Sequence, residues 1–358
     1  MLSSQVETHS DEAKTLKAVY IEKTGGVEVL QIGERPTPKP GPDEILIRVH
    51  AASINPRDWL IRSGRYPFQF MLPKFPLVLG SDVSGVVECV GSGVDRFKQG
   101  DAVFASRTGG HGGYAEYMAI DQSMAALKPK NMSHIQASAV PLAALTSWRA
   151  LFTNGRMKEN QRLLIIGGSG SCGSFGVQIA KAFSAHVTAV CSTPNVAMVK
   201  ALGADQVIDY KKESFFDGQE SYDIIYDTIG KENLKKCRAI LKKKGVYITT
   251  VPRTPALISA AISKITPGRR SEVVLFRSDG LILEKIADLT EAGKIRSLID
   301  KIYPFEEVAA AHTYSRSFHT KGKLILTPDY NLDNASASSS AESSPSPFSQ
   351  TATGSPEG

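Results

Sequence analysis

The pattern of apolar and polar positions changes character near residue 130. Before it, short apolar runs alternate with stretches rich in Gly, Pro and Asp, which favour turns. We expect strands in KAVYIEK, EILIRVHAASI, SGVVECVG, DAVFAS and AEYMAI, separated by PTPKPGPDE, GSGVDRFKQG and RTGGHGGY. This pattern therefore predicts a mostly β domain over residues 14–130.

From about residue 131, apolar runs of strand length alternate with stretches long enough for a crossover helix. We expect strands in RLLIIG, HVTAVCS, DQVIDY, YDIIYDTIG and GVYITTV. Such alternation is typical of a parallel, doubly wound sheet. The terminal run KGKLILTPD predicts one more strand, returning to the first domain. The chain is therefore expected to be an α/β protein with a β domain at 14–130, completed by 297–328, and a doubly wound domain at 131–296.

The two ends of the chain differ from this body. Residues 1–13 hold three acids and no base, and we expect them to be flexible. Residues 329–358 are rich in Ser, Ala and Pro with few bulky apolar side chains, so they cannot bury enough surface to fold. We expect a disordered tail.

A glycine-rich loop, GGSGSCG, follows the strand RLLIIG and precedes a helix marked by apolar residues four apart. Its Gly168, Gly170 and Gly173 form GxGxxG, and Gly167 also gives GxxGxxG. The first glycine allows a tight turn, the second lets backbone N–H groups approach a pyrophosphate, and the third admits close helix packing. Between a strand and a helix, this motif predicts a dinucleotide site rather than a turn without a ligand.

The next strand ends where a NAD-binding fold places an acid for the ribose 2′-hydroxyl. This chain has CSTPN there. The Ser192 hydroxyl, the Asn195 amide and the Tyr210 hydroxyl are expected to donate to a 2′-phosphate, so NADPH is favoured over NADH. The alternative is that Ser192 only caps the following helix.

Composition limits the kinds of site and the cellular location that we expect. The chain has 358 residues and four cysteines without a CxxC pair, which indicates neither a disulfide framework nor a thiolate zinc site. There is no apolar run of about 18 residues and no basic leader, so we expect a cytoplasmic protein. Residues 14–328 hold 42 basic and 29 acidic residues. The densest basic cluster, 231–245, is expected to be a solvated helix face, because it lacks the aromatics of a nucleic-acid site.

Several ordered motifs carry a family resemblance: ASINPRDWLIRSGRYP, PLVLGSDVSGVVECVGSGVDRFKQGDAVFA, GGYAEY, PLAALTSWRAL, the glycine loop, LGADQVIDY and KGKLIL. Over residues 14–328 the chain resembles the zinc-free quinone oxidoreductase (zeta-crystallin-like) branch of the medium-chain dehydrogenase/reductase superfamily. AHVTAVCS and LGADQVIDY are most similar to reticulon-interacting mitochondrial oxidoreductases and their bacterial and plant relatives. The resemblance implies a GroES-like catalytic domain and a Rossmann domain that binds NADPH.

The chain departs from the zinc alcohol dehydrogenases where these hold their metal. Asn55 stands where those relatives have an early cysteine ligand, and Gly80-Ser81-Asp82 replaces Gly-His-Glu. The lobe with four cysteines is absent, and the histidines are scattered. We therefore expect no metal site, and we expect Asp82 to be structural and paired with a base. Without a Lewis acid, alcohol oxidation is disfavoured.

A quinone or an activated alkene needs less help, because conjugation spreads the developing charge onto a carbonyl oxygen. Tyr66 matches the catalytic tyrosine of the related mitochondrial enoyl-thioester reductases, although it could equally be an aromatic pocket wall. By the same resemblance Asn55 orients substrate or nicotinamide, and Thr146 lines the nicotinamide side.

The resemblance also implies the residues that bind the cofactor. Cys172 stands where the family usually has Val, and we expect it to pack inward rather than to be an exposed thiol. The implied cofactor residues are Ser169, Gly170, Ser171 and Cys172 in the loop, the turn from Thr228 to Gly230, Val251, and Lys323 near the last strand.

Residues 254–270 are apolar at the centre and basic at the end. In this superfamily that region lies near the subunit contact, so we expect a homodimer face or a pocket wall; peripheral membrane contact is the alternative. For the whole protein we expect an NADPH-dependent quinone or enone reductase. The alternatives are an enoyl-thioester reductase, or an NADPH-binding protein without turnover that associates with RNA or a membrane.

Overall fold

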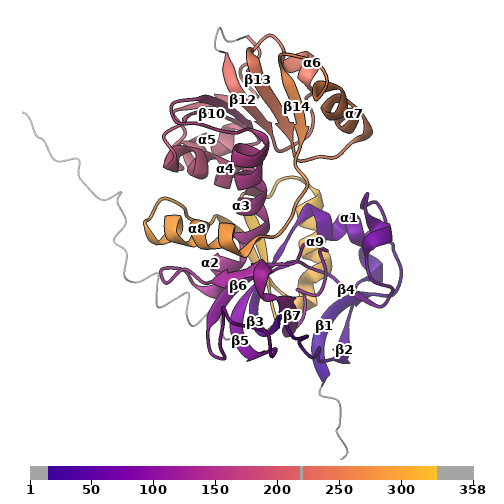
Figure 1. Cartoon of the computed structure of the whole chain (residues 1–358). Helices are drawn as coiled ribbons and strands as arrows, with labels where there is room; N and C mark the ends of the chain where they lie inside the picture. The colour runs from indigo at the N-terminus through magenta and orange to yellow at the C-terminus, as the bar shows by residue number, and fades with distance from the viewer. Residues whose placement is uncertain (1–14, 218–220, 329–358) are drawn as a thin grey trace, which may run out of the picture.

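The computed structural model describes residues 15–217 and 221–328. The predictions for residues 1–13 and for the tail from 329 to 358 lie outside these ranges. Figure 1 shows two bodies stacked one above the other, a parallel sheet with helices in the upper one and a mostly β body in the lower one. The chain has the predicted fold, a GroES-like β domain and a Rossmann-like domain.

The upper domain holds a six-stranded parallel sheet in the order β11-β10-β9-β12-β13-β14. Successive strands are added outward, from β9 to β11 on one side of the sheet and from β12 to β14 on the other. In such a sheet the ligand crevice is expected at the carboxyl ends of the two central strands, β9 and β12. The short β14 is not expected from the sequence, because three of its four residues are polar and it follows directly on the turn and basic residues at 266–269. The strands are β9 (Arg162–Ile166), β10 (His186–Cys191), β11 (Gln206–Asp209), β12 (Tyr222–Asp227), β13 (Leu241–Thr249) and β14 (Arg270–Val273).

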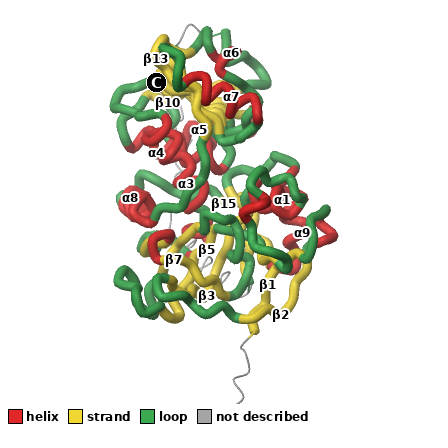
Figure 2. Tube along the Cα trace, turned by 45° about the vertical axis from the view of Figure 1, so that its right-hand side comes forward, coloured by secondary structure: helices red, strands yellow, loops and turns green. Residues whose placement is uncertain are grey.

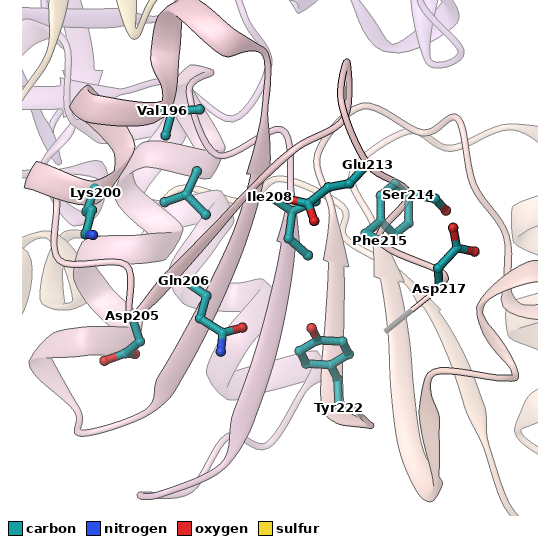
Figure 3. Close-up of a pocket in the computed structure, with 11 residues that line it drawn as sticks. Val196, Lys200, Asp205, Gln206, Ile208, Glu213, Ser214, Phe215, Asp217 and Tyr222 are labelled. Atoms are coloured by element: carbon teal, nitrogen blue, oxygen red, sulfur yellow. The ribbon is translucent and has the colours of Figure 1, made fainter. Parts of the chain in front are cut away.

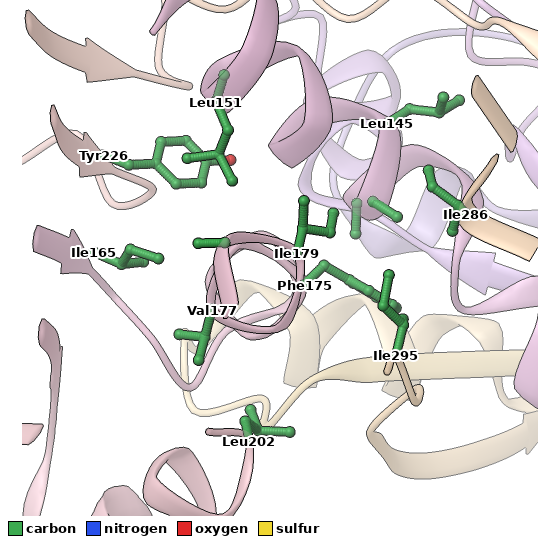
Figure 4. Packing of buried hydrophobic residues seen from close by; sticks show 14 of the residues in the cluster. Leu145, Leu151, Ile165, Phe175, Val177, Ile179, Leu202, Tyr226, Ile286 and Ile295 are labelled. Carbon is green, nitrogen blue, oxygen red and sulfur yellow. The ribbon is translucent and has the colours of Figure 1, made fainter. Parts of the chain in front are cut away.

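Helices cover both faces of this sheet. Phe175, Val177 and Ile179 of α4 are buried. Figure 4 shows them between Ile165 and Tyr226 of the sheet on one side and Ile286 and Ile295 on the other. The helices are α3 (Pro141–Trp148), its π-helical continuation η4 (Arg149–Asn154), α4 (Ser171–Ala182), η5 (Thr193–Asn195), α5 (Val196–Ala201), α6 (Leu234–Cys237) and α7 (Thr254–Ser263).

The basic cluster at 231–245 is not a helix face, so that prediction was wrong. Only four of its residues form α6, and the strand β13 begins at Leu241. Leu241 pairs with Tyr222, and Val246 pairs with Ile224 of β12. Pairing with a distant strand supplies the backbone hydrogen bonds that a local helix would otherwise make.

The lower domain is built around the long strand β3 (Glu44–Ile54), which coincides with the predicted run EILIRVHAASI. It lies within a sheet ordered β15-β16-β3-β5-β6-β8, with β7 also paired to β3; a second sheet is ordered β2-β1-β4. The strands are β1 (Thr15–Ile21), β2 (Gln31–Pro36), β4 (Leu77–Val78), β5 (Asp82–Val90), β6 (Ala102–Ser106), β7 (Tyr117–Asp121), β8 (Ala125–Leu127), β15 (Ile299–Pro304) and β16 (Lys323–Thr327).

Four α-helices and four short 3-10 turns complete the described chain. In both views α1 and α9 lie side by side on the lower domain, and they are in contact (Figures 1 and 2). These elements are α1 (Pro56–Arg62), α2 (His134–Ser138), α8 (Gly280–Glu291), α9 (Val308–Arg316), η1 (Val27–Val29), η2 (Gln69–Met71), η3 (Gln122–Met124) and η6 (Phe305–Glu307).

The strand β16 joins the two domains. β16 pairs with β3 of the first domain through Leu324 and Ile54, as the sequence predicts for the terminal strand. Just before it, Gly322 forms a parallel bridge with Gly170, and its N–H donates to the carbonyl of Ser169 at 3.1 Å. The glycine loop is therefore tied directly to the strand that enters the catalytic domain.

Candidate active site

The glycine loop fixes the first edge of the site. Gly167 has a φ of +88°, and a Cβ there would lie 2.5 Å from Oγ1 of Thr228. The turn glycine is therefore Gly167, the first glycine of the GxxGxxG pattern, rather than Gly168, the first glycine of GxGxxG. A Cβ on Gly173 would lie 2.1 Å from the carbonyl oxygen of Gly167, so only glycine lets α4 approach the loop so closely.

Gly170 differs from these glycines. Its φ is −78°, and a Cβ there would meet only the carbonyl oxygen of Gly167, at 3.5 Å. Nothing in the described chain therefore requires glycine at this position. A bound group that approaches the backbone at the start of α4 does require it, because the first N–H groups of a helix have no partner inside it. The loop fits the pyrophosphate of a dinucleotide.

Three of the predicted phosphate-side residues lie together. Nδ2 of Asn195 donates to the hydroxyl oxygens of Ser169 at 3.2 Å and of Ser192 at 3.1 Å. Ser192 stands at the start of η5 but makes no capping hydrogen bond with its side chain, which argues against the alternative that it only caps the helix. Tyr210 is half-exposed, and its backbone N–H donates to the carbonyl of Cys191 at 3.1 Å.

An acid that the sequence argument did not weigh lies close by. Asp209 ends β11 beside η5, and a hydrogen bond from the Thr193 side chain is the main cause that lowers the pKa of its carboxyl group. Nζ of Lys211 lies 5.4 Å from the centre of the Tyr210 ring. The crevice therefore offers an acid turned to Thr193 and a base beside Tyr210. An acid or base search limited to the end of β10 misses both, because Asp209 ends the next strand, β11, and Lys211 follows it.

The turn after β12 forms the opposite edge of the crevice. Oδ1 of Asp227 accepts from the N–H groups of Ile229 at 2.9 Å and Gly230 at 2.8 Å, and Oδ2 accepts from Tyr247 at 2.8 Å. The hydroxyl of Thr228 donates to the carbonyl of Ile166 at 2.8 Å. Asp227 was missed by the sequence argument, although an acid directly after an apolar strand and before Thr-Ile-Gly is a signal for such a turn.

Val251 closes this turn. Gly230 has a φ of +71°, and a Cβ there would lie 2.6 Å from Cβ of Val251. The structure thus brings together Thr228, Gly230 and Val251, all predicted for the cofactor, at the carboxyl edge of β12 and β13.

Thr146 of α3 carries an unsatisfied hydroxyl. The residue is 5% exposed, and its Oγ1 has no hydrogen-bond partner within the described chain. The adjacent Ser147 hydroxyl donates to the carbonyl of Cys172 at 2.7 Å, which ties α3 to the first turn of α4. Since a buried polar atom without a partner costs free energy, this hydroxyl fits a hydrogen-bonding group of a bound cofactor.

Cys172 is partly buried and packs against the core around α4. Burial raises the pKa of its thiol to about 11. A thiol with so high a pKa is a weak nucleophile at neutral pH.

A buried polar network joins both domains below the loop. Nζ of Lys323 donates to Oδ1 of Asn55 at 2.6 Å and to Oδ2 of Asp82 at 3.2 Å, while Nδ2 of Asn55 donates to Oδ2 of Asp82 at 3.0 Å. Asp82 also accepts from the Ser53 hydroxyl at 2.9 Å and from the N–H of Leu142 at 3.1 Å. The expectation that Asp82 pairs with a base is confirmed. Additional hydrogen bonds of this kind are what a fully buried ion pair needs.

Zinc does not fit this arrangement. The ammonium group of Lys323 already uses oxygens of Asn55 and Asp82, and Ser81 replaces the expected histidine ligand. Across residues 15–217 and 221–328 no three His, Cys, Asp or Glu side chains converge as a metal site would require. Asn55 is buried with both ends of its amide bonded inside the protein, so it positions the network.

Asp58 extends the network towards Tyr114. Its Oδ2 accepts from the N–H of Asn55 at 2.7 Å and from the Tyr114 hydroxyl at 2.7 Å. Burial raises the pKa of Asp58 to about 6. Asp58 was not predicted from the sequence, although INPRD places it three residues after Asn55, the spacing of a capping box.

Tyr66 lies in the loop after α1. Its ring meets that of Phe68 edge-on, with the centroids 5.7 Å apart, and it packs partly against the core of the first domain. Its hydroxyl has no hydrogen bond to the part of the chain that the structure describes. The geometry leaves open both predicted roles, hydrogen-bond donor and pocket wall.

A cavity of about 620 Å³ lies beside the edge strand β11. Figure 3 shows Lys200 and Asp205 on one side of it and Glu213, Phe215 and Asp217 on the other. It contains none of the predicted site residues, and its three acids would repel a phosphate. This cavity is therefore separate from the cofactor crevice.

The described helices are all too short or too polar to cross a bilayer.

Comparison with known proteins identifies relatives along the whole described chain. Residues 41–130 match the family model described as alcohol dehydrogenase GroES-like domain, and residues 202–326 match the one described as zinc-binding dehydrogenase. The human protein named NAD(P)H oxidoreductase RTN4IP1, mitochondrial, is 34% identical over 90% of this chain and 91% of its own. The NADPH-dependent alkenal/one oxidoreductase, chloroplastic, of Arabidopsis thaliana is 34% identical over 88% of this chain and 80% of its own.

Solved structures give the same result. The quinone oxidoreductase from Coxiella burnetii superposes with a TM-score of 0.80 at 30% identity, covering 88% of this chain and all of that one. Sequence and fold therefore point to one group of proteins.

Proposed function

The chain belongs to the zinc-free quinone oxidoreductase branch of the medium-chain dehydrogenase/reductase superfamily, and on that premise we propose that it reduces quinones or the C=C bond of α,β-unsaturated carbonyls with NADPH. It is a nicotinamide-dependent oxidoreductase. The choice of NADPH, the acceptor and the role of each side chain are our proposals.

The observation that carries this proposal is the buried network of Lys323, Asn55 and Asp82. An ammonium group bonded to these side chains stands in place of a metal ligand set, so the protein offers hydrogen bonds rather than a Lewis acid to the substrate. A simple alkoxide would be poorly stabilised by hydrogen bonds alone. A conjugated acceptor is better suited, because its charge moves to a carbonyl oxygen that one donor can stabilise.

When bound, the reduced nicotinamide supplies the hydride. Thr146 would hold that end of the cofactor through its hydroxyl, and the loop from Ser169 to Cys172 would hold the pyrophosphate. A hydride delivered to the β-carbon would shift the π electrons of the C=C bond to the carbonyl oxygen. Tyr66 donates a hydrogen bond to this oxygen, and a proton from solvent completes the reduction at the α-carbon.

NADPH is favoured on the phosphate side. The hydroxyls of Ser169 and Ser192 are held together by Asn195, and Lys211 lies beside the Tyr210 ring. These groups are suited to a 2′-phosphate. The Asp209 carboxyl accepts a hydrogen bond from the Thr193 side chain and one from the N–H of Lys211 at 3.0 Å, whereas its Oδ2 has no partner within the described chain.

The test is NADPH oxidation by the purified protein, in the presence of a chelator, against quinones, alkenals and enoyl thioesters. We expect turnover on quinones or alkenals, and a drop of about 10²-fold or more in kcat for Tyr66→Phe. Tyr117→Phe, on β7, is the matched control and should keep full activity. Turnover confined to enoyl thioesters would favour the enoyl-thioester reductase instead, and tight NADPH binding without any turnover would favour the non-catalytic alternative.

Two further points remain part of the proposal. We propose a cytoplasmic location, whereas the names of the human and Arabidopsis relatives state mitochondrial and chloroplastic ones. Fluorescence microscopy of the tagged full chain tests it. We also keep the boundaries 14–130, completed by 297–328, and 131–296 as proposed domain limits.

A further inference from the structure

The helix α7 turns an apolar side to solvent. Of its ten residues only Ser263 is buried. Leu257 is 45% exposed, Ile258 is 54%, Ile262 is 52%, and Ile265 just beyond the helix is 85% exposed. Their spacing of one, four and three residues places them along one stripe of the helix. A contiguous apolar stripe on a surface marks an interaction site.

Basic residues surround this stripe. Residues 231–270 contain eleven Lys and Arg and a single acid, Glu232, whereas the whole chain has a net charge of only +6. Arg253 precedes α7 and Lys264 follows it. Within the described part of the chain, Lys243, Lys244, Arg253 and Lys264 form no ion pair.

The fold brings the lysine run of β13 to the same end of the molecule. Nε of Arg269 donates to the carbonyl of Leu241 at 2.8 Å, and a Cβ on Gly268 would lie 3.6 Å from the carbonyl oxygen of Lys243. The chain leaving α7 therefore runs alongside Lys242–Lys244. In Figures 1 and 2, α6 and α7 lie at the end of the upper domain that is farthest from the GroES-like domain.

We propose that this surface, formed by the apolar stripe of α7 and the basic residues Lys243, Lys244, Arg253 and Lys264, docks on a bilayer that contains anionic phospholipid. Isoleucine and leucine side chains enter the boundary between headgroups and acyl chains, and the lysines stay at the headgroup phosphates. Each base near such a surface strengthens binding about fivefold. The contact is peripheral.

A second copy of the chain is the competing occupant. A symmetric dimer through this surface would place two copies of the same basic segment against each other, because both partners of a two-fold contact use the same patch. Like charges brought together across an interface repel. An anionic bilayer instead supplies the opposite charge along with an apolar phase. The charge therefore favours the membrane over the homodimer expected for this segment.

The experiment is vesicle flotation of the intact purified chain, with phosphatidylcholine vesicles and with vesicles that also contain phosphatidylserine. We expect flotation only with phosphatidylserine, weakened by salt. Lys243→Gln with Lys264→Gln should weaken binding about 25-fold, and Ile262→Asn with Ile265→Asn by about tenfold or more. All four side chains are exposed, so folding is retained. Leu281→Asn with Lys285→Gln, exposed on α8, is the matched control and should bind like the unaltered chain.

Three results would overturn the proposal. The first is that the intact chain stays unbound with phosphatidylserine vesicles. The second is that the α7 variants float as well as the control. The third is that flotation is absent and another partner binds instead. A dimer in sedimentation velocity that Ile262→Asn with Ile265→Asn dissociates would assign the surface to a second copy of the chain. Binding of a homopolymer RNA by the lysines would assign it to nucleic acid.

Discussion

Nζ of Lys323 lies 2.6 Å from Oδ1 of Asn55, although 268 positions separate the two residues in the chain. The contact fastens β16 to the start of α1. The residue before Lys323 is bridged to the glycine loop. Substrate-side and cofactor-side elements thus meet at one buried lysine.

We expect Lys323→Met to destabilise the protein by about 3–5 kcal/mol, because it leaves the Asp82 carboxylate buried without its cation. Urea denaturation measures the change. Lys323→Met combined with Asp82→Asn should cost less than Lys323→Met alone, since no charge is then left uncompensated. Lys321→Met, at an exposed lysine two residues away, serves as the control. Equal losses for the single and double variants would mean that the ion pair is not the cause.

Gly170→Ala and Gly173→Ala should separate ligand binding from folding. At Gly173 the added methyl group collides with the Gly167 carbonyl, so the melting temperature should fall steeply. At Gly170 the protein leaves room, and stability should change by about 1 kcal/mol or less. NADPH binding, followed by fluorescence titration, should nevertheless weaken about tenfold or more. Unchanged binding in Gly170→Ala would contradict a pyrophosphate at this loop.

Thr146→Val should leave stability within about 0.5 kcal/mol, because the hydroxyl that it removes has no partner in the described protein. The same change should raise the Kd for NADPH several-fold, as about 1 kcal/mol of hydrogen bonding is lost. Thr290→Val removes a hydroxyl that donates to the Ile286 carbonyl at 2.8 Å and should show the reverse pattern. Calorimetric titration measures the Kd for NADPH of both variants, and thermal denaturation measures their stability.

Tyr210→Ala should reduce discrimination between the two nicotinamide cofactors. Its side chain is half-exposed at the end of β11, so folding should be unaffected. We expect the KM for NADPH to rise about tenfold while the KM for NADH changes little, because only NADPH carries the 2′-phosphate. Tyr20→Phe, on β1, is a suitable control. A parallel rise in both KM values would place Tyr210 elsewhere on the cofactor.

The pH dependence of stability should reflect His312. This residue is fully buried on α9, and burial lowers its pKa from 6.5 to about 3. Between these values the unfolded chain binds a proton that the folded chain does not, so stability is complete above about pH 6.5 and is lost as the pH falls towards 3. The slope is about 1.4 kcal/mol per pH unit.

In His312→Phe, the free energy of unfolding from urea denaturation should therefore fall less steeply between about pH 6 and pH 4. His319→Gln, at an exposed position, should not change this slope. Asp58, whose pKa is raised to about 6, acts in the opposite direction and is present in all of these proteins. The difference between the unaltered chain and His312→Phe consequently isolates the histidine. Identical slopes would show that His312 becomes protonated without unfolding.

Much of the fold follows from local pattern. The strands β3, β9, β10 and β12 are long apolar runs between turn residues, and their positions are evident from the sequence. The short strands β4, β8 and β14 are not, because so short a segment is stabilised by its neighbours rather than by its own pattern. β11, also of four residues, is the exception, since it lies within the predicted run DQVIDY. The lysine-rich start of β13 was mistaken for a helix for the same reason.

The sequence by itself determined the residue types of the site: a glycine loop after a strand, hydroxyl and amide groups where an acid would select NAD, and Asn55 and Ser81 in place of metal ligands. These signals are local, since each lies within a few residues of a recognisable strand end. Only the tertiary structure decided which residues act together. Lys323 meets Asn55 and Asp82, Asp227 shapes its turn with Tyr247, and Asp209 faces Thr193. These contacts form because strands from distant parts of the chain end at one edge of a sheet. A polar group buried there can form hydrogen bonds only with the groups that lie next to it in space.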